Sequence, residues 1–110
     1  MLIATRVLKL RNTNVEIEIP TRIFAPQPQA VDWSCKTGID WPDGTVTMDA
    51  IGIDAVQALE LGLKLIGAQL YASDHHASGR LIWQEPGKGY DFPVVNSLRD
   101  MLIGDDKTFT

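Results

Sequence analysis

Two adjacent histidines, His75 and His76, are the residues of this sequence best suited to chemistry near neutral pH, because an imidazole can transfer a proton or bind a metal ion there. Asp74 precedes them and adds a carboxylate. A metal centre needs further ligands at a suitable spacing, and the chain has no other histidine and one cysteine. At the end of a predicted helix these residues also suit a structural role, since positive charge is favourable near a helix C-terminus. The sequence favours this role, and a small enzyme or a metal or ligand site using Asp74, His75 and His76 is the alternative.

Other reactive residue types lack the neighbours that their chemistry requires. Cys35 falls on the inward side of a predicted strand, where a cysteine behaves as a small hydrophobic residue. The Gly-Lys-Gly at 87–89 lacks the spacing and the Ser or Thr of a phosphate-binding loop. Four aspartates between 40 and 54 include a turn residue and a helix cap, so they do not favour general acid–base catalysis. We therefore predict no catalytic residue and no cofactor.

Trp41 is the tryptophan most suited to binding a partner. It precedes Pro42 at the end of a predicted hairpin, where a partly exposed aromatic side chain can anchor an interface. The alternative is that Trp41 packs on its own turn. Trp33 alternates with Cys35 and is predicted to lie in the core.

The composition describes a single folded domain over residues 1–110, with a polar tail at about 104–110 that we expect to fray. With 45% hydrophobic and 22% charged residues, the chain can bury one core. Ten Lys and Arg against 14 Asp and Glu give a net charge of −4, with no basic run. We therefore expect no binding to nucleic acid or to an anionic membrane surface, because both require a basic patch. No apolar run reaches the roughly 18 residues of a membrane span.

The cysteine content and the N-terminal residues both bear on the compartment. A single cysteine excludes an internal disulfide. The first twelve residues, MLIATRVLKLRN, lack the basic and apolar regions of a signal peptide. Both observations fit a reducing cytosol, and we expect a cytoplasmic protein.

The pattern of apolar and turn-forming residues predicts two hairpins. Residues 2–10 and 15–19 have the character of strands on either side of a polar turn. The proline-rich segment 20–30 indicates an edge or a loop. Residues 31–39 and 45–52 alternate around a turn that contains Pro42 and Gly44.

A long helix follows the second hairpin, over 52–76, and a short strand at 81–83 and a short helix at 96–102 come after it. Strands followed by a helix are typical of an α+β fold. We expect an antiparallel sheet of four to five strands with the long helix packed on one face. Asp54 and Gln57 have the spacing of a capping box at the start of that helix.

Projected at 100° per residue, the long helix has an apolar arc wider than one sheet contact needs. The stripe predicted to face the sheet is Val56, Leu59, Leu63, Ile66 and Leu70. The polar side predicted to face solvent is Gln57, Glu60, Lys64 and Tyr71. Between them lies a flank rich in small residues, the helix flank: Ala58, Leu61, Gly62, Leu65, Ala68, Gln69 and Ala72.

Two kinds of cover would satisfy the helix flank. One is the C-terminal segment, through Leu98, Met101, Leu102 and Phe92. The other is a partner chain, most simply a second copy in a symmetric homodimer. The two are compatible, and in the second case Trp41 and the helix flank (without Leu61) form the predicted interaction surface.

A Trp-x-Cys strand, a hairpin and the helix sequence GIDAVQALELGLKLIGAQL resemble a family of small bacterial proteins of unknown function. The resemblance covers roughly residues 31–95. The matching residues are Trp33, Cys35, Gly52, Asp54, Gln57, Ala58, Leu59 and Phe92. Most of these fit core, capping and packing roles, so the resemblance supports the fold and implies no activity.

The sequence therefore favours a non-catalytic module for protein–protein interaction, either homodimeric or bound to another protein. Small α+β architectures of this kind also occur in bacterial immunity-type proteins, an analogy at the level of the fold alone. A third possibility is a small ligand bound between sheet and helix, which requires a cavity of a few hundred Å³.

Overall fold

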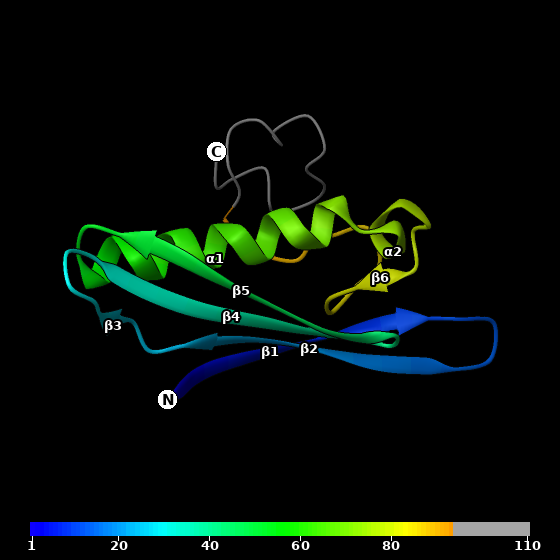
Figure 1. Ribbon diagram of the computed structural model, residues 1–110. Helices are drawn as coiled ribbons and strands as arrows, with labels where there is room; N and C mark the ends of the chain where they lie inside the picture. The colour runs from blue at the N-terminus through cyan, green and yellow to red at the C-terminus, as the bar shows by residue number, and fades with distance from the viewer. Residues whose placement is uncertain (94–110) are drawn as a thin grey trace.

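The computed structural model describes residues 1–93, which form an antiparallel sheet with a long helix on one face (Figure 1). The elements are β1 (Leu2–Arg11), β2 (Glu16–Phe24), β3 (Gln27–Pro28), β4 (Trp33–Trp41), β5 (Gly44–Gly52), α1 (Ala55–Ala72), α2 (Asp74–Ala77) and β6 (Leu81–Ile82). The α+β fold is confirmed. The predicted helix at 96–102 and the tail at 104–110 lie outside the described residues.

Both predicted hairpins are present, β1 with β2 and β4 with β5. The strands lie side by side in the order β5–β4–β2–β1–β6, and the two-residue β3 also pairs with β4. All of the pairings are antiparallel. Among the strands of residues 1–93, β5 is therefore the last one at one side of the sheet.

The segment 20–30 departs from the prediction, because β2 continues through Pro20 to Phe24. Pro20 lies opposite Val7 of β1, and the ladder between β2 and β4 begins only at Thr21. At Pro20, β2 therefore has a paired neighbour on one side only. Proline is tolerated at such a position although it has no N–H to donate. Pro28 lies in the short β3, a position that agrees with the prediction.

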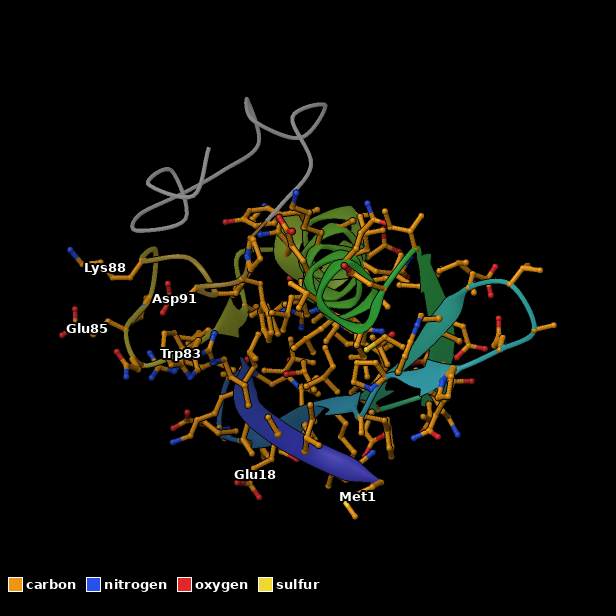
Figure 2. The ribbon with its side chains drawn as sticks, turned by 90° about the vertical axis from the view of Figure 1, so that its left-hand side faces the viewer. Met1, Glu18, Trp83, Glu85, Lys88 and Asp91 are labelled. Atoms are coloured by element: carbon orange, nitrogen blue, oxygen red, sulfur yellow. The ribbon has the colours of Figure 1, made fainter. Side chains whose placement is uncertain are left out.

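The core lies between the sheet and α1. Its buried residues are Leu8, Leu10, Ile19, Ile23, Cys35, Ile39, Ala58, Ile66, Leu70, Tyr71, Leu81, Tyr90 and Phe92. The opposite face of the sheet is polar, and Glu18 points away from α1 there (Figure 2). Opposite charges lie in register across its strands: Lys9 with Glu18, Arg11 with Glu16, and Lys36 with Asp49. One face is therefore packed and the other solvated, as alternation in antiparallel strands dictates.

The start of α1 is fixed by the predicted capping box. The Asp54 carboxylate accepts a hydrogen bond from the backbone N–H of Gln57 at 2.8 Å. The Gln57 side-chain oxygen in turn accepts from the backbone N–H of Ile53 at 2.7 Å. Gly52 must stay without a side chain, because a Cβ there would lie 2.4 Å from the backbone nitrogen of Ala58.

The face that α1 turns to the sheet includes Ile66 and Leu70 of the predicted stripe but is rotated from it. Val56 is 74% exposed and Tyr71 is 2% exposed, the reverse of the prediction in both cases. The small residues Ala58 and Gly62 lie against the sheet instead. A Cβ at Gly62 would come within 3.0 Å of the Cys35 sulfur, so the helix axis approaches the sheet closely.

α1 ends at Ala72 and does not reach the histidines. Ser73 ends it and also begins α2: its Oγ donates to the Leu70 carbonyl at 2.7 Å and accepts from the His76 N–H at 3.1 Å. The predicted single helix over 52–76 is therefore two helices. Within residues 1–93, no helix is long and apolar enough to cross a membrane.

Candidate functional site

Both histidine rings are held by aromatic neighbours. His75 stacks on Trp41, with 4.9 Å between ring centroids and 23° between planes. The Nδ1 of His76 lies 2.6 Å from the hydroxyl of Tyr90, and its ring meets Tyr71 edge-on at 4.6 Å. These contacts fasten the segment after α1 to the turn between β4 and β5 and to the buried Tyr90.

This geometry offers the histidines little room for metal chemistry. Asp74 is exposed in the first turn of α2, and both imidazoles make contacts within the fold. Over residues 1–93, no group of three or more His, Cys, Asp or Glu is placed to hold a metal ion. The two histidine rings therefore pack against Trp41, Tyr71 and Tyr90. No spacing in the sequence predicts the contacts with Trp41 and Tyr90, because these residues are distant from the histidines along the chain.

Trp41 is half-buried and stacks on His75, which lies outside its own turn. It pairs with Gly44 at the turn of the β4–β5 hairpin. Trp41 lines neither of the two cavities that border α1.

The helix flank divides into a buried and an accessible part. Ala58 and Gly62 are buried against the sheet, so their prediction as partner contacts is wrong. Leu65 and Ala68, with Leu61, border a groove beside β5. Gln69 is half-buried and Ala72 is exposed, and both lie outside this groove.

The groove between α1 and β5, here the β5 groove, has a volume of about 270 Å³. The residues that line it are Asp49, Ala50, Ile51, Leu61, Lys64, Leu65 and Ala68. Ile51 is 49% exposed, and Ile53 and Val56, near the start of α1, are also exposed. Lys64 is tied to Glu60 on its own helix at 3.2 Å. The accessible surface is therefore mostly apolar.

The outer edge of β5 borders the same groove. Among the described residues β5 pairs only with β4, through nine successive pairs without a bulge. Its sequence, GTVTMDAIG, contains no proline and one charge, Asp49. Edge strands are usually short, kinked, or protected by proline or lysine. The two-residue β6 is an edge of the short kind, and β5 has none of these protections.

An ion pair on the solvated face ties the central strands together. Arg22 of β2 contacts Asp40 of β4, and the Thr45 hydroxyl of β5 donates to Asp40 at 2.9 Å. The hydrogen bond from Arg22 lowers the pKa of the Asp40 carboxyl and raises the pKa of the guanidinium.

Burial raises the pKa of the Cys35 thiol, so this thiol stays neutral and unreactive.

A second cavity, of about 390 Å³, lies between α1 and the strands β1 and β2. The residues that line it are Ala4, Thr5, Arg6, Thr21, Ile23, Leu63, Ile66, Asp91, Phe92 and Pro93. It has the size that the ligand-binding possibility requires. Arg6 is not among the residues predicted from the sequence to form a site. The alternation that turns Leu8 and Leu10 inward also turns Arg6 inward, and a charged residue at an inward strand position is the signal that could have indicated it.

The family model described as Domain of unknown function (DUF6968) matches residues 4–94 of the chain. The match confirms the resemblance to a domain family of unknown function, and it also includes most of β1 and all of β2, which that resemblance did not cover. No curated protein and no solved structure matches the chain.

Proposed function

The chain belongs to the family Domain of unknown function (DUF6968), and we propose that it acts as a non-catalytic protein–protein interaction module whose partner is a second copy of the chain. The observation that carries the proposal is the edge of β5, which is unpaired among residues 1–93, is nine residues long and is bordered by an apolar groove. We place this dimer in the bacterial cytoplasm, where a lone buried cysteine such as Cys35 is stable.

The edge of β5 is suited to pairing with itself. Two copies related by a two-fold axis near Met48 would pair their β5 strands antiparallel and continue the sheet. In that register Met48 faces its own counterpart and Asp49 faces Thr47 of the second copy, so no two like charges lie directly opposite each other. Lys36, opposite Asp49 within the chain, offsets the diagonal approach of the two Asp49 carboxylates.

The helix flank completes the interface. Continuing the sheet through β5 places the two α1 helices next to each other on the same face. Leu61, Leu65 and Ala68 then close the groove from both sides, and Ala68 lets the helices approach. The accessible part of the helix flank thus finds its cover in the second copy.

The area is sufficient for a specific dimer. Nine residues of strand span about 30 Å, and the sheet and helix layers together are about 20 Å deep. The contact therefore covers about 600 Å² on each copy. The total of about 1,200 Å² lies at the lower end of stable protein–protein interfaces.

The test is sedimentation equilibrium of the full chain across micromolar to millimolar concentration, with one variant and one matched control. Ile51→Lys places a charge on the edge strand β5, at a residue that borders the β5 groove, and is expected to give a monomer. Ile3→Lys changes the same residue type at nearly the same exposure, 47% against 49%, on β1, and is expected to leave the dimer intact. A wild-type monomer at every concentration, or equal effects of the two substitutions, would refute the proposal.

A further inference from the structure

Two charged residues, Arg6 and Asp91, line the cavity between α1, β1 and β2, and the contacts of Arg6 are unusual. Arg6 of β1 is half-buried, and its Nη1 donates to the backbone carbonyls of Tyr90 at 3.2 Å and Asp91 at 2.6 Å. Its guanidinium carbon lies 4.1 Å from the ring centre of Trp83 and 4.8 Å from that of Phe92. Figure 2 shows Trp83 and Asp91 on the same side of the molecule, in the chain that follows β6.

The positive charge of Arg6 has no carboxylate partner among residues 1–93, where the ion pairs are Arg11–Glu16, Arg22–Asp40 and Lys64–Glu60. The two Nη1 hydrogens are used by the two carbonyls. Nε and Nη2 make no hydrogen bond to the described residues, and together they form the edge of a guanidinium that binds a carboxylate through two parallel bonds. With respect to the described part of the chain, this edge of Arg6 is therefore available to a ligand.

The guanidinium is also already ordered. The aromatic rings of Trp83 and Phe92 and the two carbonyl bonds fix its plane. Asp91, whose carbonyl accepts the shorter bond, has a φ of 60°, which is rare outside glycine. Residues held in such conformations concentrate at binding sites. A ligand that meets Arg6 thus loses little affinity to ordering of the protein.

The rest of the cavity is apolar where it meets the helix and β2. Ile23, Leu63, Ile66 and Phe92 line it, and Thr21 adds no free donor because its hydroxyl donates to the Arg6 carbonyl at 2.7 Å. A volume of about 390 Å³ equals about 13 water molecules at about 30 Å³ each. That space suits a ligand of about ten to fifteen non-hydrogen atoms.

We propose that this cavity binds a small organic carboxylate, with its carboxylate on the Nε–Nη2 edge of Arg6 and its apolar body along Ile23, Leu63 and Ile66. All of the lining residues lie within the region 4–94 that matches the family, so the site is complete within the family domain. The site lies across α1 from the β5 groove and does not depend on the dimer proposed above.

The test uses the uniformly ¹⁵N-labelled full chain, titrated with octanoate and with 3-phenylpropanoate and followed by amide chemical shifts, with calorimetry for affinity. Their neutral amides, octanamide and 3-phenylpropanamide, are matched in shape. We expect saturable carboxylate binding with shifts at residues 4–6, 63–66 and 91–92, and at least tenfold weaker binding of the amides. Octylamine tests whether the cavity prefers a cation to a carboxylate, because Asp91 also lines the cavity.

Two substitutions locate the site. Arg6→Lys keeps the charge but loses the two-pronged edge and should weaken carboxylate binding about tenfold, whereas Arg11→Lys on the same strand should not change it. Ala4→Phe fills the cavity from an exposed position on β1 and should abolish binding with Arg6 still in place. The proposal fails if the full chain shows no saturable binding up to about 10 mM, if the amides or octylamine bind as well as the acids, or if binding survives Ala4→Phe unchanged.

Discussion

Replacing Gly62 by alanine tests the close approach of α1 to the sheet. In a helix interior, glycine to alanine ordinarily stabilises by about 1 kcal/mol. Here the new methyl carbon would lie 3.0 Å from the Cys35 sulfur and 3.3 Å from the end of the Ile23 side chain. Ile23 borders the cavity and has room to move. Cys35 is fully buried in β4, and its Sγ donates a hydrogen bond to the Phe24 carbonyl at 3.3 Å. Cys35 therefore has no room to move.

The magnitude follows from these two opposing effects. Forcing a methyl group into a packed core costs about 1–3 kcal/mol, which exceeds the gain in helix propensity. We expect Gly62→Ala to lower the free energy of unfolding by about 1 kcal/mol. In a Cys35→Ala background the sulfur is absent and the nearest cysteine atom, Cβ, is at an ordinary 3.5 Å. There the same substitution should raise the free energy of unfolding by about 1 kcal/mol.

The assay is a double-mutant cycle by urea unfolding, read by tryptophan fluorescence. The expected coupling between positions 35 and 62 is about 2 kcal/mol, within the range for residues in contact. The control is Ala68→Gly on the accessible flank, which should cost about 1 kcal/mol with either residue at position 35. If Gly62→Ala stabilises by the same amount in both backgrounds, the packing of Gly62 on Cys35 is wrong.

Three further predictions concern contacts that hold the elements in place. Asp54→Ala should cost about 1 kcal/mol of unfolding free energy in urea, because a cap is lost, whereas Asp54→Asn should keep most of it. The pKa of Asp40 is lowered in the fold, so its contribution is present above its unfolded pKa of about 3.9 and is lost as pH falls through the folded value. The stability difference between wild type and Arg22→Gln should therefore be full at pH 7 and shrink below about pH 4; a difference independent of pH would contradict this. Tyr90→Phe removes the hydrogen bond with His76 and should cost about 1 kcal/mol; an unchanged urea midpoint would show that this contact adds nothing.

Local patterns predicted the parts of the fold that depend on neighbouring residues. The alternation in β4 and β5 placed Cys35 and Ile39 in the core, and the turn at Pro42–Gly44 joined the two strands. The capping box between Asp54 and Gln57 is local for the same reason. These features are decided within a few residues, so the sequence contains them directly.

The candidate sites were predicted only in part. Leu65 and Ala68 lie at the β5 groove as part of the wide apolar arc, but Ala58 and Gly62 do not. A helical wheel ranks positions by side-chain polarity and cannot register how closely the helix approaches the sheet. Here the small residues Ala58 and Gly62 allow α1 to approach the sheet closely, and with this face buried Val56 points outward.

The sequence by itself determined the two hairpins, the presence and the start of the long helix and the absence of a disulfide, because each rests on local pattern or on composition. The tertiary structure decided which helix face is buried, what the histidines contact and that Arg6 meets a cavity. Each of these depends on pairs far apart in the chain: Gly62 with Cys35, His76 with Tyr90, and Arg6 with Asp91. Such pairs are set by how whole elements pack, and no spacing along the sequence encodes them.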